Sequence, residues 1–123
     1  MSIQTAQQRI VNTLPELTIE TIDNKSAVMI RPEGNLLVLE RRRPEKTKEI
    51  FTFGLYVAKK ILNNDTSRIY TDLDYIVEGI ESAGMGSAFD EDIGVTFVEQ
   101  AGFENGILEY RCEIYVTESK MPK

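Results

Sequence analysis

The sequence predicts a single α+β domain over residues 1–123, with a mostly antiparallel sheet of four to six strands packed by two main helices. Apolar residues recur at helical spacing in two segments, 2–14 and 70–80, and alternate with a period of two in most of the remaining chain. Most connections between the predicted strands have hairpin length, which favours antiparallel pairing over a doubly wound parallel sheet. A chain of 123 residues is also long enough to bury one core without disulfides.

The first predicted helix runs from Ser2 to Leu14. Its apolar residues lie at spacings of three, four and seven, which places them on one stripe: Ile3, Ala6, Ile10, Val11 and Leu14. Ser2 is suited to cap the amino end, and Pro15 favours an end near Leu14.

Strand-like alternation begins after this helix. A short strand over residues 17–22 and a turn at Asp23-Asn24 are followed by two strands, Ala27–Arg31 and Leu36–Arg41, around a turn at 32–35. Whether residues 17–41 form two strands or three stays open.

The clearest strand covers residues 51–58, after a charged stretch at 41–49. Both of its faces are partly apolar, so we expect a central strand with material packed on each side. One face carries Phe51, Phe53, Leu55 and Val57.

The second predicted helix begins near Thr71. Thr71 with Asp74 resembles a capping box, and Tyr70 with Tyr75 has the spacing of a hydrophobic staple. Its buried stripe consists of Leu73, Ile76, Val77 and Ile80. Gly84 is expected just beyond its end, in a loop that continues to Ser87.

A hairpin closes the predicted fold. Val95, Phe97 and Glu99 alternate along one strand, Asn105-Gly106 marks a turn, and residues 107–116 form the partner strand. Residues 117–123 are expected to be a polar, mobile tail.

The composition counts against several kinds of active site. The absence of histidine removes the usual zinc sites and imidazole bases. The single cysteine, Cys112, excludes an internal disulfide and lies among apolar residues, so we expect a buried, inert thiol. We therefore expect no enzyme, no catalytic residue, no metal and no cofactor.

Membranes and nucleic acids are also disfavoured as partners. The sequence has no apolar run near the ~20 residues of a membrane span, and it does not open with a secretory signal. The net charge of -6 is the reverse of the basic excess that nucleic-acid binders usually show, so we expect no specific nucleic-acid partner.

Charge is divided unevenly along the chain. Residues 1–60 carry ten basic and seven acidic residues, whereas residues 61–123 carry four and thirteen. Such a two-signed molecule can associate with copies of itself or with neighbours. The candidate protein-interface residues are the densest cluster of each sign: Arg41, Arg42, Arg43, Lys46 and Lys48, and Asp90, Glu91 and Asp92.

Each cluster has alternative interpretations. The basic residues could contact phosphates, but three glutamates interleave with them and no aromatic residue lies among them. The acidic residues could hold a divalent cation, but the spacing of a calcium loop is missing. A simply solvated loop remains an alternative for the basic cluster.

The element order and three segments resemble a known family. The segments are Ile69–Ile80, Val95–Val98 and Gly106–Val116, taken together with the leading helix and the central hairpins. In these respects the chain resembles the tail-terminator proteins of long-tailed bacteriophages. Neck and tail-completion proteins share much of the same architecture, so the choice among them stays open.

This resemblance implies a structural virion assembly protein of the tail or neck, assembled in the host cytoplasm. Such a subunit forms a ring, typically a hexamer, on the last ring of the tail tube protein. The ring stops growth of the tube and presents a surface to the head-neck connector protein. The alternatives are a small regulatory or adaptor module that binds a protein partner, and an unrecognised enzyme that uses carboxylates or tyrosines.

Overall fold

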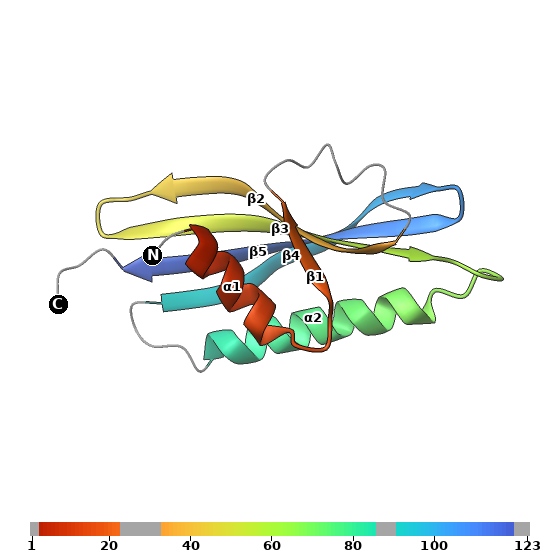
Figure 1. The fold of residues 1–123 in the computed structure, drawn as a ribbon. Helices are drawn as coiled ribbons and strands as arrows, with labels where there is room; N and C mark the ends of the chain where they lie inside the picture. The colour runs from red at the N-terminus through yellow and green to blue at the C-terminus, as the bar shows by residue number, and fades with distance from the viewer. Residues whose placement is uncertain (1–2, 23–32, 86–90, 120–123) are drawn as a thin grey trace.

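The computed structural model describes residues 3–22, 33–85 and 91–119. The elements in these ranges are α1 (Ile3–Thr13), β1 (Ile19–Ile22), β2 (Gly34–Pro44), β3 (Lys48–Lys60), α2 (Ser67–Met85), β4 (Glu91–Glu104) and β5 (Ile107–Ser119). The strands make one layer and the helices another (Figure 1). This arrangement confirms the predicted α+β class.

The five strands of the described residues form one sheet in the order β1-β2-β3-β5-β4. β1 pairs with β2 in parallel, and every other neighbouring pair is antiparallel. β3 lies in the middle, as its two partly apolar faces predict. No helix in the described ranges is long and apolar enough to span a bilayer.

One face of the sheet carries the main core. The inward residues of β3 (Phe51, Phe53, Leu55 and Val57) are fully buried against both helices. α1 contributes Ala6 and Ile10, followed by Leu14, and α2 contributes Ile69, Ile76 and Ile80. The helical stripes therefore pack as their periodicity predicts except at Val77, which was expected in the core but is only partly buried, while Ile69 is buried instead.

The opposite face carries a smaller buried cluster of Leu36, Val38 and Tyr56. A β-bulge in β2 between Leu39 and Arg41 lies next to this cluster. Because a bulge adds one residue to one strand, the neighbouring residues Glu40 and Arg41 both lie on the face away from the helices. This bulge sets up the polar network described below.

The second helix starts one turn earlier than predicted. The carboxylate of Asp65 accepts the backbone N–H of Ser67 at 2.9 Å, so the cap precedes Ser67 rather than Thr71. Asn63 and Asn64 adopt left-handed backbone angles, φ 56° and 59°, and make the turn that leads into the helix. The predicted Thr71–Asp74 capping box is therefore wrong.

The predicted staple of Tyr70 and Tyr75 is wrong as well, because each ring has a partner outside the helix. Tyr70 packs edge to face on Tyr110, with ring centroids 6.2 Å apart. The hydroxyl of Tyr75 accepts the backbone N–H of Glu16 at 3.1 Å. Gly84, predicted to follow the helix, lies within it, since α2 continues to Met85.

The strands of the last hairpin are longer than predicted, and one of them is bulged. β5 includes Thr117, which was expected in a mobile tail. A bulge between Val95 and Phe97 separates these residues, so Val95 packs against the core with Val98 and Phe97 lies on the opposite face. The predicted common face of Val95 and Phe97 is therefore wrong.

Several predictions fall outside the described residues. They concern the cap at Ser2, the turn at Asp23-Asn24, the strand Ala27–Arg31 and the end of the tail at 120–123.

Candidate protein-interaction site

The predicted basic residues lie at the tip of the β2–β3 hairpin. Arg41, Arg42 and Arg43 belong to β2, Lys46 lies in the turn, and Lys48 opens β3. The expectation of a charged loop over 41–49 is wrong, because β2 continues to Pro44 and β3 already begins at Lys48. We call Arg41, Arg42, Arg43, Lys46 and Lys48 the basic corner.

Part of the basic corner is neutralised by its own glutamates. Arg42 forms a bidentate ion pair with Glu49, in which Nη2 and Oε1 are 2.9 Å apart. The guanidinium of Arg42 also lies 5.4 Å from the centre of the Phe51 ring. Hydrogen bonding to Glu49 raises the pKa of Arg42 above its usual value.

A second set of pairs centres on Glu45. This carboxylate pairs with Arg43 and lies 4.0 Å from the ammonium of Lys48, and its hydrogen bond to Arg43 lowers its pKa. Arg41 and Lys46 are exposed and take part in neither set. Five cations and two carboxylates leave the basic corner with a net positive charge.

The predicted acidic residues lie at the start of β4. Glu91 and Asp92 are the first two residues of this strand, paired with Glu118 and Thr117 of β5. The interpretation as a loop before a strand is therefore wrong for these two residues, and Asp90 lies outside the described residues. We call Glu91 and Asp92 the acidic corner.

Strand pairing brings the two corners to the same end of the sheet. Pro44 pairs with Glu49, Glu49 with Glu118, and Glu118 with Glu91, so one row crosses β2, β3, β5 and β4. The basic corner lies at one side of this end and the acidic corner at the other, at the left of Figure 1. The sequence named both clusters but did not predict this placement.

Both corners adjoin a sheet edge. β1 pairs with β2 only from Asn35 to Val38, and beyond that point no strand of the described ranges lies on the side of β2 away from β3. β4 is the outermost strand on the other side. The outer edge of β2 beyond Val38 therefore presents peptide groups of the kind that can pair with another chain.

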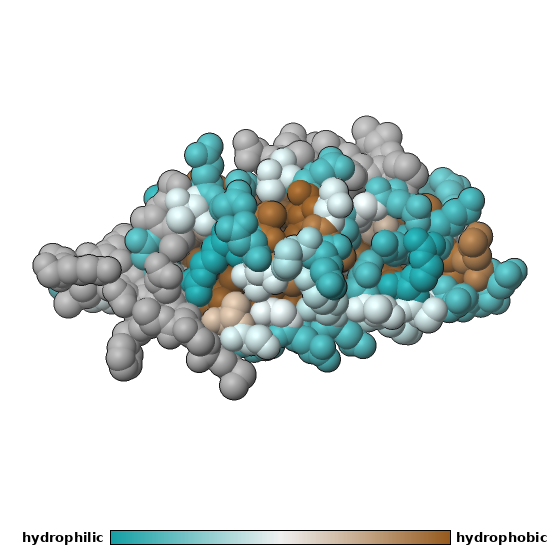
Figure 2. Space-filling view, turned by 60° about the horizontal axis from the view of Figure 1, so that its bottom comes forward, coloured by the Kyte–Doolittle hydropathy of each residue, from teal (hydrophilic) through white to brown (hydrophobic). Residues whose placement is uncertain are grey.

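Apolar residues gather at the opposite end of the molecule. Leu62 and Phe103 are 58% and 60% exposed, and Tyr70 is 47% exposed. Leu62 follows β3, Phe103 lies near the β4–β5 turn, and Tyr70 lies in the first turn of α2. In Figure 2 hydrophobic surface is visible at the right-hand end, away from the two corners. We call these three residues the apolar end.

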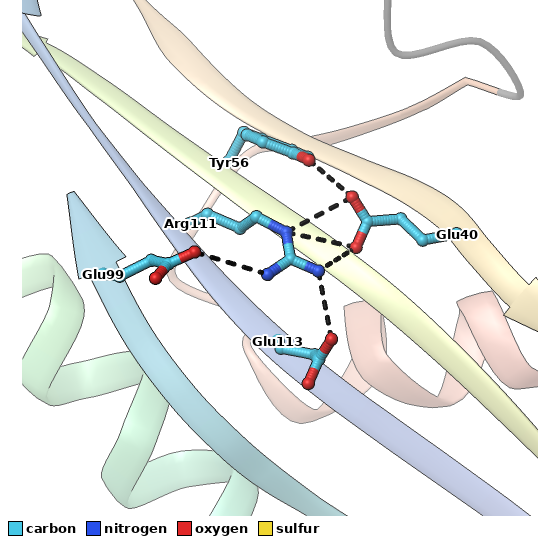
Figure 3. A network of polar contacts seen from close by, with 5 residues as sticks. All are labelled: Glu40, Tyr56, Glu99, Arg111 and Glu113. Atoms are coloured by element: carbon cyan, nitrogen blue, oxygen red, sulfur yellow. Dashed lines mark hydrogen bonds and ion pairs between the residues drawn. The ribbon is translucent and has the colours of Figure 1, made fainter. Parts of the chain in front are cut away.

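A polar network that the sequence did not predict crosses the face away from the helices (Figure 3). The guanidinium of Arg111 binds Glu40 through two of its nitrogens, binds Glu113 at 3.1 Å and lies 3.9 Å from Glu99. Tyr56 donates its hydroxyl to Glu40. The network thus ties together β2, β3, β5 and β4.

Gly54 makes room for this network. A Cβ atom at this position would lie 2.7 Å from a carboxylate oxygen of Glu40. A glycine within an otherwise apolar strand is a signal of such close approach. Gly54 was therefore the feature of the sequence from which a close approach at this point of β3 could have been predicted.

Electrostatics in the network favour a neutral tyrosine and a charged arginine. Burial, followed by the hydrogen bond to Glu40, raises the pKa of Tyr56 far above its usual value. The hydrogen bond to Glu40 also raises the pKa of Arg111. Arg111 lies 5.1 Å from the ring of Phe97, which covers it from β4.

The raised pKa of Tyr56 predicts that the protein loses stability at alkaline pH. A tyrosine pKa that is higher in the folded chain stabilises folding below about pH 10, and this contribution is lost as the pH rises further. Tyr56→Phe should lower the free energy of unfolding by about 1 kcal/mol at pH 7, and the gap to the wild type should close above about pH 10. Urea unfolding of the wild type and Tyr56→Phe between pH 7 and 11.5 measures the loss at neutral pH and the closing of the gap. A constant gap over this range would contradict the shifted pKa.

Three other places in the described residues were candidates for a site: Cys112, clusters of acidic side chains and a hollow beside α2. Burial raises the pKa of Cys112 to about 12, so its thiol stays protonated at neutral pH. The described residues contain no group of three acidic, cysteine or histidine side chains placed to hold a metal. An open hollow of about 260 Å³ beside the start of α2 is lined by Lys59, Ser67, Arg68, Thr71 and Asp72. Lys59 and Asp72 form an ion pair there at 3.0 Å.

Comparison with known proteins finds no family model and no curated protein that matches this chain.

Proposed function

We propose that this chain is a structural subunit that assembles into a ring, and that it serves as a tail terminator of a long-tailed bacteriophage. The proposal rests on the resemblance in element order and on the placement of charge at the sheet edges. In this role the ring, typically a hexamer, sits on the tail tube protein in the virion and receives the head-neck connector protein. The subunit acts by binding copies of itself and its neighbouring proteins, and it catalyses no reaction.

The observation that carries the proposal is the pair of oppositely charged corners at one end of the sheet. A two-fold contact through either edge sets like charge against like charge, which disfavours it. A head-to-tail contact sets the basic corner of one copy against the acidic corner of the next. Such a contact generates a closed ring when the rotation from one copy to the next divides a full turn.

The test is the dependence of assembly on salt. Sedimentation velocity at 0.05 to 0.5 M NaCl should give a closed oligomer at low salt, with the dissociation constant rising roughly tenfold or more with salt because exposed charges are screened. Arg43→Glu should weaken assembly, whereas Arg68→Glu, an exposed arginine near the apolar end, should not. A monomer at every protein and salt concentration would contradict the proposal.

The apolar end favours a second candidate, an adaptor module that binds a protein partner. Exposed Tyr70 and Phe103 are of the aromatic type that is enriched at protein interfaces, and Leu62 adds apolar surface at the same end. An adaptor remains monomeric or dimeric at all salt concentrations, so the same sedimentation experiment separates the two functions.

A further inference from the structure

We propose that the outer edge of β2 over Arg41–Pro44 binds an extended, acidic segment of another protein, which adds to the sheet as an antiparallel strand beside β2. This inference goes beyond the proposed ring, since one copy of the chain is enough for it. The partner segment is defined by its chemistry. It carries acidic residues two positions apart, and the residue between them offers its backbone N–H and C=O to the edge.

This edge is open in the part of the chain that the structure describes. β1 covers β2 only as far as Val38, and over Arg41–Pro44 the described strands pair with β2 on the β3 side alone. Beyond the bulge that follows Leu39, Arg41–Pro44 pairs regularly with residues 49–52 of β3. A regular, open stretch of edge strand is what an added strand requires.

The peptide groups of this stretch offer both a donor and acceptors. The N–H of Glu45 donates to the carbonyl of Lys48 at 2.8 Å, so this pair is hydrogen-bonded. Because hydrogen-bonded and non-hydrogen-bonded pairs alternate in an antiparallel ladder, the N–H and C=O of Arg42 point away from β3. The C=O of Pro44 does so too, but Pro44 has no N–H, which ends the pairing at the tip. An added strand would accept from Arg42 and donate to the carbonyls of Arg42 and Pro44.

Side-chain charge at this edge favours an acidic strand. Arg41 and Arg43 share one face of β2, because residues two positions apart along a strand point the same way. Among the described residues no carboxylate pairs with Arg41, and the side chain of Arg43 is 61% exposed although it pairs with Glu45. In the added strand, the two neighbours of the residue opposite Arg42 lie beside these arginines. Acidic side chains there stabilise the pairing.

The same features disfavour two other occupants. A second copy of this edge would set arginines opposite arginines, and like charges directly opposite destabilise a ladder. The phosphates of a nucleic acid would match the arginines, but they accept hydrogen bonds and cannot donate to the outward carbonyls of Arg42 and Pro44. The net charge of -6 also repels a polyanion from the rest of the chain. A protein strand satisfies both the charge and the edge.

Hydrogen exchange at single amides tests this inference. The probe is the capped peptide acetyl-Gly-Thr-Glu-Val-Glu-Thr-Gly-amide, in which the glutamates are two positions apart. The full chain is diluted until sedimentation shows monomers, because the proposed ring contact uses the same corner. Exchange is then measured at low salt, with and without a large excess of peptide, by mass spectrometry with fragmentation to single residues.

In the free chain the N–H of Arg42 should exchange faster than that of Arg43, which belongs to a hydrogen-bonded pair with β3. The glutamate peptide should slow exchange at Arg42 about fivefold or more. Two matched peptides are the controls. One has lysines in place of both glutamates, and the other has an N-methylated valine, which removes the N–H that donates to the carbonyl of Arg42. Neither should slow exchange at Arg42.

A charge exchange on the protein gives a second measurement. In R41E/R43E the glutamate peptide should no longer slow exchange at Arg42, and the lysine peptide should slow it instead. R68E is the matched control, because Arg68 is exposed in α2 away from this edge, and it should respond as the wild type does.

Unchanged exchange at Arg42 with the glutamate peptide would overturn the inference. Equal slowing by the N-methylated peptide would overturn strand pairing, and equal slowing by the lysine peptide would overturn the choice of an acidic partner. A single-stranded oligouridylate that slows Arg42 as strongly as the glutamate peptide would assign the edge to nucleic acid instead. None of these results bears on the ring, which fails only if the wild type sediments as a monomer at every protein and salt concentration.

Discussion

Replacing Arg111 with methionine should lower the free energy of unfolding by about 2 to 4 kcal/mol. The side chains of Arg111, Glu40 and Glu113 are only 18%, 21% and 21% exposed. Arg111→Met removes the cation from two partly buried carboxylates, Glu40 and Glu113, and leaves Glu40 with the hydroxyl of Tyr56 but no opposing charge from Arg111. Remaining contact with water keeps the expected loss below that of a fully buried pair.

Urea unfolding at high salt, where assembly is disfavoured, measures this loss. Arg68→Met is the matched control, because Arg68 is exposed, and it should change the free energy of unfolding by less than about 0.5 kcal/mol. Glu40→Gln, alone and combined with Arg111→Met, gives the coupling between the two residues. Equal losses for Arg111→Met and Arg68→Met would show that the network does not stabilise the fold.

Replacing Phe53 with alanine should cost about 3 to 5 kcal/mol, the largest effect we expect from one substitution. Phe53 is fully buried at the middle of the central strand, paired with Leu39 on one side and Ile114 on the other. Its loss leaves a cavity that the sheet on one side and the helices on the other can only partly fill.

Phe103→Ala provides the comparison for this prediction. Phe103 is 60% exposed at the apolar end, so the same change should cost less than about 1 kcal/mol. Midpoints of urea unfolding at high salt measure both variants. Similar losses for Phe53→Ala and Phe103→Ala would contradict the assignment of the core to the helix-covered face.

Periodicity predicted the elements better than it predicted their ends. The stripe of α1, the inward face of β3 and three of the four stripe residues of α2 were predicted correctly, because burial of one face imposes the repeat on the sequence; Val77 was the exception. The start of α2 was misplaced because Asp65 and Thr71 are both good caps, and the turn at Asn63-Asn64 decided between them. β2 continues through charged residues because strand pairing at a hairpin tip does not require apolar side chains.

The β-bulges could not be predicted from the sequence, for a different reason. Phe97 was assigned to the same face as Val95 because strict alternation was assumed along the strand. One extra residue at Thr96 moves Phe97 to the other face, where it covers Arg111. A bulge changes no residue type in the pattern, so composition carries no sign of it.

For the candidate site, the sequence supplied the residues, and the fold determined their neighbours. Two charge clusters could be named from the chain, but their common end of the sheet follows from the strand order β2-β3-β5-β4. The network was hidden because Glu40 and Arg111 are 71 residues apart in the sequence. Only pairing of their strands with β3 brings them together.

By itself, the amino-acid sequence determined most of the buried stripe of each helix, the inward face of β3 and where charge of each sign is concentrated. These properties depend on local spacing and side-chain chemistry, which are present before the chain folds. The tertiary structure alone decided which strands are neighbours, where a bulge changes the face of a side chain, and which charges share an end. Those features depend on pairing and packing between segments distant in sequence, which local spacing does not specify.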